Sequence, residues 1–142
     1  MLVVLDTDHI SILQMRNQPD CDRLEARLSQ HPSDEIAVSI VSFQENVEGW
    51  LAWIKRAKKD AQIVEGYQQL VSILQDYCRA RVLPFDDAAQ TCFVSLRKDY
   101  RRVQTLDLRI ASIALSNQAK LLTRNRKDFG NIRGLILDDW TR

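Results

Sequence analysis

The sequence predicts an α/β protein, a three-layer α/β/α sandwich around a central, mainly parallel sheet of about five strands. Short apolar runs alternate along the chain with longer amphipathic patterns, and strands that alternate with helices pair in parallel through right-handed crossovers. The chain has 142 residues, with only four glycines and three prolines and without a linker or an internal repeat. These observations predict a single domain over residues 1–142.

Five short apolar runs are the predicted strands. Their brevity and their content of leucine and β-branched residues are typical of strands that are buried on both faces of a parallel sheet. The runs are LVVL at 2–5, IAVSIV at 36–41, RVLPF at 81–85, AKLLT at 119–123 and GLIL at 134–137.

Amphipathic patterns fill the intervals between these runs. We expect helices that start near Thr7 or Asp8, over 20–30, over 42–59, over 62–80, from a cap at Asp86 or Asp87 to about Tyr100, and over 105–116. In the fourth pattern, apolar residues recur at helical spacing and predict one apolar stripe, made of Ile63, Tyr67, Leu70, Val71, Leu74, Tyr77 and Cys78.

Charge and cysteine content exclude several classes of protein. The net charge is +1, so bulk charge indicates no partner. Residues 97–133 nevertheless hold ten Lys or Arg and three Asp, which permits an anionic substrate at one face, although a solvated basic surface is the commoner cause. Three widely spaced cysteines without a CxxC pair predict neither a disulfide framework nor a zinc site. Without a signal-peptide pattern or a membrane-length apolar run, we expect a cytoplasmic protein.

Acidic side chains lie where predicted strands give way to helices or loops. Asp6 ends the first strand, Glu45 lies just after the second in the first turn of the next helix, and Asp107 lies in the first turn of the helix that starts near 105. Asn125 and Asp128 follow the AKLLT run. Ligands of such sheets collect beyond the carboxyl ends of the strands. We therefore expect these side chains to meet at one edge of the sheet.

Most of these acids also have a purely structural explanation. The S-x-x-E pattern that ends at Glu45 is a capping box, and Asp107 is placed to complement a helix dipole. Asp8 is expected to be the N-cap of the first helix, and Asp128 fits a turn. Asp6 has no such role, because it closes an apolar strand.

Three carboxylates at one sheet edge repel one another unless a divalent cation lies among them. Mg²⁺ and Mn²⁺ prefer oxygen ligands, and Mg²⁺ usually keeps several waters and a substrate phosphate. Phosphodiester hydrolysis uses such a site, because the metal activates a water and offsets the charge of the transition state. The pattern therefore favours Asp6, Glu45 and Asp107 as ligands of Mg²⁺ or Mn²⁺.

Basic residues crowd the same end of the chain and suit a polyanion. Lys and Arg hold nucleic-acid phosphates without distinguishing sequence. The candidates for RNA-backbone contacts are Arg124, Arg126 and Arg109. Other chemistries lack their motifs: no HxxxH or HExxH pattern joins the two histidines, and GxGxxG, P-loop and GxSxG patterns are missing.

The sequence resembles the PIN domain, and more narrowly the VapC-type toxins of bacterial toxin–antitoxin pairs. The matching segments are LDTDHISIL, SIVSFQENVEGWLAWI and TLDLRIASIALSNQAKLLTRNRKDFGNIRGLILDDW. The last is the most specific, because its D-x-x-I-A-x-x-A-L pattern, LLTRN strand end, KDF turn and closing DDW occur in order. The resemblance spans nearly the whole chain, with 55–80 the least diagnostic, and implies a PIN-like sandwich.

The resemblance implies a Mg²⁺- or Mn²⁺-dependent endoribonuclease in which Asp6, Glu45 and Asp107 match the acidic triad. The family often has a fourth acid where this chain has Asn125. Either Asn125, through a metal-held water, or the catalytic candidate Asp128 then takes the fourth position. The family also commonly has a glycine in place of residue 104, which is Gln here, so the start of that helix is expected to differ slightly.

The resemblance also implies partners: a second copy of the chain in a homodimer, and a VapB-like antitoxin that inserts a segment beside the acids. Trp53, three residues after Trp50, fits an exposed interface residue and fits a core residue equally well. Two other functions stay open, a PIN-like module that binds RNA or a protein without cutting, which Asn125 favours, and a nuclease that acts on DNA. RNA is preferred through the resemblance alone.

Overall fold

Five parallel strands form the centre of the protein. The computed structural model describes residues 1–142, and the strands lie in the order β3-β2-β1-β4-β5 with every neighbouring pair parallel. Their bounds are β1 Val3–Leu5, β2 Ile36–Ser39, β3 Val82–Leu83, β4 Lys120–Leu122 and β5 Leu137–Asp138. The five-stranded parallel sheet predicted from the alternation of strands and helices is confirmed.

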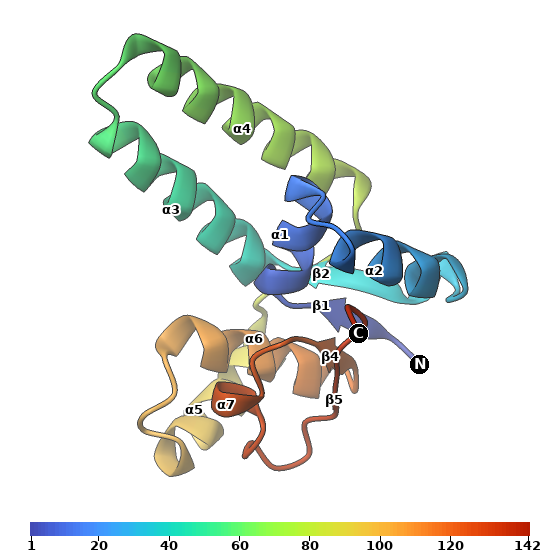
Figure 1. The fold of residues 1–142 in the computed structure, drawn as a ribbon. Coiled ribbons are helices and arrows are strands. Elements are labelled where there is room, and N and C mark those ends of the chain that lie inside the picture. The colour runs from blue at the N-terminus through green and yellow to red at the C-terminus, as the bar shows by residue number, and fades with distance from the viewer.

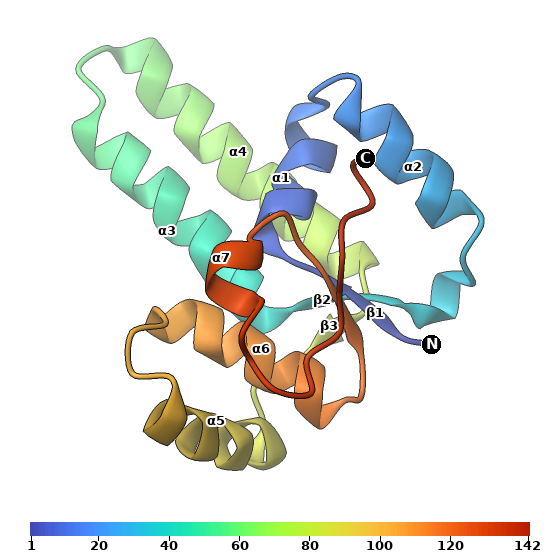
Figure 2. The same cartoon turned by 60° about the horizontal axis from the view of Figure 1, so that its bottom comes forward.

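Helices cover both faces of the sheet and complete the three-layer sandwich (Figures 1 and 2). The helices α1, α2 and α4 pack on one face, and α5 and α6 pack on the other. None of the helices has the length and hydropathy needed to cross a membrane. The bounds are α1 Thr7–Met15, α2 Asp20–Ser29, α3 Ile40–Arg56, α4 Asp60–Arg79, α5 Asp87–Asp99, α6 Thr105–Ser116 and α7 Arg126–Phe129, with a short 3-10 helix at Ser33–Glu35.

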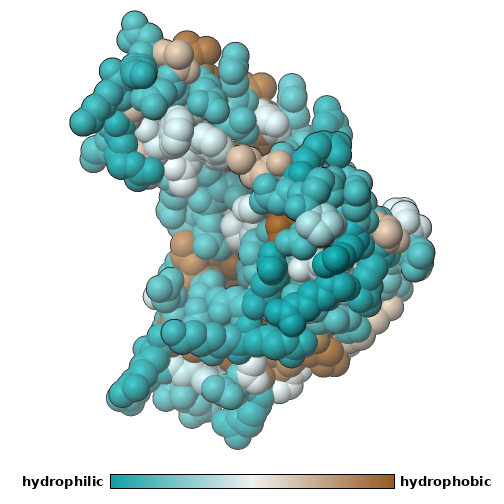
Figure 3. Space-filling model, in the orientation of Figure 1, coloured by the Kyte–Doolittle hydropathy of each residue, from teal (hydrophilic) through white to brown (hydrophobic).

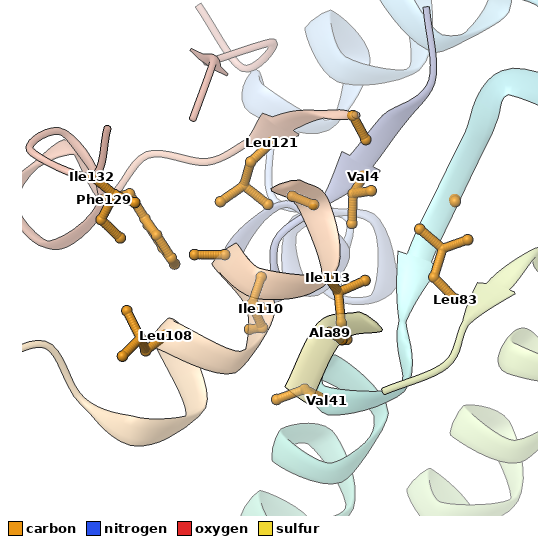
Figure 4. Close-up of a cluster of buried hydrophobic side chains, with 14 residues drawn as sticks. Val4, Val41, Leu83, Ala89, Leu108, Ile110, Ile113, Leu121, Phe129 and Ile132 are labelled. Atoms are coloured by element: carbon orange, nitrogen blue, oxygen red, sulfur yellow. The ribbon is translucent and has the colours of Figure 1, made fainter. Parts of the chain in front are cut away.

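Each face of the sheet has its own hydrophobic core, because successive side chains of a strand point to opposite faces. On one face, Val4 and Leu121 pack with the fully buried Ile110 and Ile113 of α6 (Figure 4). The second core is on the other face and includes Val3, Leu5, Ile10, Leu24, Ile73, Tyr77, Leu122 and Trp140. This packing fixes α6, and so its first turn, against the strands.

The helices α3 and α4 form a hairpin that projects from the sandwich (Figure 1). Within it, the indole N–H of Trp53 donates to the carbonyl of Gln62 at 3.1 Å, and the Trp50 and Trp53 rings meet edge to face at 5.6 Å. A Cβ at Gly66 would collide with the side chain of Ile54, so glycine allows the two helices to approach closely. Both tryptophans are half-buried, and Trp50 also packs against a hydrophobic core of the sandwich.

The apolar stripe predicted along α4 is mostly exposed. Tyr67, Val71 and Leu74 are each more than half exposed, at 57%, 55% and 56%. Only Ile73 and Tyr77, in the half of the helix next to the sandwich, belong to the core. Leu74 and Cys78 are exposed although they directly follow these two core residues, so most of the stripe faces away from the sandwich.

Several element boundaries differ from the sequence prediction. The second strand ends at Ser39 rather than at 41, because α3 already begins at Ile40 with Ser39 as its N-cap, accepting from the Ser42 amide at 3.1 Å. The last strand begins at Leu137 rather than at 134. The segment predicted as a turn after β4 contains the short helix α7, which is capped by Asn125. Side-chain caps decided the two helix starts.

Candidate functional site

Four acidic side chains reach the carboxyl edge of the sheet from different elements. Asp6 follows β1 directly, Glu45 lies on α3 after β2, and Asp128 lies on α7 after β4. Asp107 lies in the first turn of α6, as predicted. Because β1 lies between β2 and β4 in a parallel sheet, the ends of these three strands are neighbours.

Asp6 is held in one orientation at the end of β1. It is 6% exposed and is the N-cap of α1. The cap role predicted for Asp8 is therefore wrong, and so is the expectation that Asp6 has no capping role. One carboxylate oxygen accepts a hydrogen bond from the Thr7 amide at 2.8 Å, and the other accepts one from the Thr123 hydroxyl at 2.7 Å. Thr123 is in place because Leu5 and Leu122, the residues before Asp6 and Thr123, are paired in the sheet.

Glu45 lies one turn further along its helix than the sequence suggested. Because α3 begins at Ile40, Glu45 is in the second turn, and Ser39 rather than Ser42 is the cap. The capping-box explanation of Glu45 is therefore wrong. Instead, the carboxylate accepts a hydrogen bond from the hydroxyl of Thr7 at 2.8 Å. This bond joins the helix after β2 to the helix after β1.

Burial and mutual repulsion raise the pKa values of three carboxyl groups at this edge. The pKa of Asp6 is raised to about 7, first by burial and then by the charge of Asp8, with Asp107 also contributing. Burial, Glu45 and Asp128 raise the pKa of Asp107 to about 6. The pKa of Glu45 is also raised, chiefly by burial. None of the three carboxylates forms an ion pair.

The residues present fit a hydrated divalent cation. The site supplies carboxylate and hydroxyl oxygens, which are the donors that Mg²⁺ and Mn²⁺ prefer, and its carboxylates lack a positive partner. No three acidic, histidine or cysteine side chains form a closed ligand group by themselves. Mg²⁺ suits this arrangement, because it usually takes one or two carboxylates and keeps several waters.

Asp8, which was predicted as a helix cap, and the neighbouring His9 lie beside the acidic edge. The Asp8 carboxylate accepts from the Arg124 amide at 2.8 Å and lies 2.7 Å from Nδ1 of His9. His9 is fully buried, and its Nε2 accepts from the Trp140 amide at 3.2 Å, so Nδ1 carries the proton and donates to Asp8. The C-terminal segment is thereby joined to the acidic edge.

Asn125 positions Asp128 through two hydrogen bonds. Its side-chain oxygen accepts from the amide of Asp128 at 3.2 Å, and its nitrogen donates to the Asp128 carboxylate at 3.0 Å. Both bonds hold Asp128 on α7. The Asp128 carboxylate in turn lies close enough to Asp107 to raise its pKa. The acid beside Asp107 is therefore Asp128, which the side-chain amide of Asn125 holds in place.

The three predicted phosphate contacts differ in their surroundings. Arg124 forms an ion pair with Asp20 at 2.9 Å. The guanidinium of Arg109 lies over the rings of Phe85 and Phe93, at 5.9 and 5.5 Å from their centroids. Arg126 is exposed and has no ion pair.

The glutamine before α6 replaces the family's glycine without distortion. Gln104 is the N-cap of α6 with φ −61° and ψ 146°, a conformation open to any residue. The start of α6 therefore does not require the conformational freedom of a glycine at residue 104.

The fold and the acidic edge define a class of proteins, the parallel α/β proteins with an acidic centre at the carboxyl ends of their strands. The sequence pattern of the PIN domain matches residues 3–135, so the chain belongs to the PIN domain family. It is 31% identical to Ribonuclease VapC1 of Haemophilus influenzae strain R2866 over the full length of both chains. Ribonucleases of this kind generally depend on divalent metal ions.

Solved structures agree with this assignment. A chain in the structure of VapBC-1 from nontypeable Haemophilus influenzae is 28% identical, superposes with a TM-score of 0.76 and covers 100% of each chain. A chain of DNA-bound VapBC from Salmonella typhimurium has the same fold, with a TM-score of 0.76, 24% identity and 99% of each chain covered. The three-layer fold predicted from the sequence is thereby confirmed.

Proposed function

We propose that this chain is a Mg²⁺- or Mn²⁺-dependent endoribonuclease that acts as the toxin of a toxin–antitoxin pair. The observation that carries the proposal is the meeting of Asp6, Glu45 and Asp107 at one sheet edge, with raised pKa values and no cationic partner. The full-length similarity to a ribonuclease supports RNA as the substrate. Asn125 does not weaken the proposal, because it holds the acid Asp128 in place.

The residues of the site divide the work of hydrolysis. Asp6, Glu45 and Asp107 would hold the metal, and Thr7 and Thr123 keep the carboxylates of Asp6 and Glu45 oriented through hydrogen bonds of 2.7 to 2.8 Å. When bound, the metal would supply an activated water and offset the charge that develops on the phosphate. Asp128 lies beside Asp107 and is held there by Asn125.

The partners expected from the sequence belong to the same proposal. Solved relatives of this fold are VapBC toxin–antitoxin assemblies, which supports a VapB-like antitoxin as the inhibitor of this chain. A homodimer, a single domain over residues 1–142 and a cytoplasmic location complete the proposal.

The experiment that tests the function is cleavage of a total tRNA pool by the purified, antitoxin-free chain. We expect cleavage with Mn²⁺ that is lost in EDTA and lost in the Asp107→Asn variant. Retention of cleavage in both controls would disprove metal catalysis at this site. A folded chain that binds RNA and Mn²⁺ but never cleaves would instead be a binding module, and parallel assays on single-stranded DNA decide between the two nucleic acids.

A further inference from the structure

A cavity of about 450 Å³ lies between the C-terminal end of α5, the loop that follows it, and α7. Figure 1 shows these segments side by side at one end of the sandwich, and Figure 3 shows a mostly hydrophilic surface over them. The residues that line this basic pocket are Lys98, Asp99, Tyr100, Arg101, Arg102, Val103, Lys127, Asp128 and Asn131.

The basic pocket holds four cations that have no anionic partner. Lys98, Arg101, Arg102 and Lys127 form no ion pair in the structure, in contrast to Arg124. The two acids that line the pocket already have partners elsewhere in the protein. Asp99 pairs with Arg133 at 3.1 Å, and Asp128 accepts from Asn125 at 3.0 Å. The pocket therefore has an excess of positive charge that an anionic ligand would neutralise.

One arginine makes the wall of the basic pocket rigid. The guanidinium of Arg97 donates to the carbonyls of Tyr100, Arg101 and Val103 at 3.0, 3.3 and 2.7 Å, and to the hydroxyl of Thr105 at 3.2 Å. These bonds fix the loop and occupy three carbonyl oxygens that would otherwise repel an anion. The pocket is thus formed before any ligand arrives.

The basic pocket and the acidic edge share a residue. Asp128 lines the pocket, and it also lies close enough to Asp107 to influence that carboxyl group. A free phosphate ion would fill only one of the two regions. A phosphodiester chain fits both, with one phosphate at the acidic edge and a neighbouring phosphate among the cations.

We propose that the basic pocket binds a backbone phosphate next to the scissile one and so sets the direction in which the RNA strand crosses the acidic edge. The inference rests on the proposed ribonuclease function. It assigns the phosphate contacts to Arg101, Arg102, Lys98 and Lys127, rather than to Arg124, which pairs with Asp20, or to Arg109, which lies over Phe85 and Phe93.

The first test compares two charge-matched double variants. Arg101→Gln with Lys127→Gln alters the pocket, whereas Arg56→Gln with Lys58→Gln removes the same charges at exposed positions near the tip of the α3–α4 hairpin. Binding of a short fluorescein-labelled oligouridylate is measured in EDTA by anisotropy over a range of salt concentrations. We expect the pocket variant to bind about tenfold more weakly and its salt slope to shrink by about 0.7 for each phosphate that the protein no longer neutralises. Equal behaviour of the two variants would overturn the proposal.

The second test locates the phosphate. One linkage of the oligonucleotide at a time is replaced by a neutral methylphosphonate. In the unsubstituted protein, one replacement weakens binding, and in the pocket variant the same replacement has no further effect, because the cations that face this phosphate are already absent. An undiminished effect in the pocket variant would contradict the assignment.

Cleavage assays with Mn²⁺ separate this proposal from the proposed function. A nuclease whose pocket variant has a raised KM and an unchanged kcat supports both. Cleavage with the same KM in both double variants would overturn the pocket alone. A chain that never cleaves but shows the pocket-dependent salt slope would overturn the nuclease and retain the pocket.

Discussion

The acidic edge and the basic pocket are neighbouring regions of unneutralised and opposite charge. At the edge the carboxylates are buried or half-buried, oriented by hydroxyl and amide donors, and shifted to raised pKa values. In the pocket the four cations are exposed and surround a rigid loop. Some acids and bases elsewhere pair with one another, as Arg124 does with Asp20.

The two regions differ in what their unpaired charges cost in folding stability. Buried charges without a partner reduce stability, whereas exposed charges cost little, so of the two regions only the acidic edge is strongly destabilising. In the proposed function, a metal ion would neutralise the acidic edge, and the phosphates of an RNA strand would neutralise the basic pocket.

The largest effect is expected from Asp107→Asn. The variant removes a ligand charge without changing the shape of the side chain, so cleavage of RNA should fall by at least about a hundredfold. Asp87→Asn, which alters an exposed acid in the first turn of α5, is the matched control. Initial rates with Mn²⁺ measure the effect. Equal rates for the two variants would show that Asp107 is an ordinary first-turn acid.

The second effect is on stability in EDTA as a function of pH. The pKa of Asp6 is about 7 in the folded chain and near 3.8 when unfolded, so between these values the folded state binds more protons. Stability should therefore fall as pH rises from about 4 to about 7, by a few kcal/mol at about 1.4 kcal/mol per pKa unit. Thermal unfolding at several pH values measures this slope.

Two controls sharpen the pH prediction. In Asp6→Asn the slope should be smaller, because the most buried of these carboxyl groups no longer ionises. Added Mg²⁺ should stabilise the parent protein more at high pH than at low pH, since the metal competes with protons for the carboxylates. A melting temperature that is independent of pH in EDTA would contradict the raised pKa values.

A smaller effect is expected from His9→Phe, which fills the same space without hydrogen bonds. The variant leaves the Trp140 amide and one oxygen of Asp8 without their partner, so the free energy of unfolding should fall by about 1–3 kcal/mol. His31→Phe, at the half-buried second histidine, is the control. Denaturant titration measures both. A loss no greater than that of the control would mean that the link to the C-terminal segment is unimportant.

The smallest effect separates two neighbouring arginines. Arg126→Gln should weaken RNA binding a few-fold, because Arg126 is exposed and forms no ion pair. Arg124→Gln should weaken it less, because the Arg124 guanidinium is already paired with Asp20 at 2.9 Å. Anisotropy at low salt gives both dissociation constants. The reverse order would show that the ion pair opens when RNA binds.

Much of the fold was predictable from the sequence, because strand and helix patterns have different periods. All five strands occur within two or three residues of the predicted runs, and Asp86 is the cap of α5 as expected. The burial of α4 was not predictable in this way. Its apolar residues recur at helical spacing, but periodicity does not tell which of them the rest of the protein covers.

The order of strands and helices and the position of acids after the strands could be predicted from the sequence, since both follow from local patterns. Which charged side chains lack an ion-pair partner was decided by the tertiary structure. Arg124 and Asp20 are 104 positions apart, and His9 reaches Trp140 across 131. Such pairs form only when the sheet brings distant segments together. For the same reason, the unpaired cations of the basic pocket and the support of Asp8 by His9 became visible only in the folded chain.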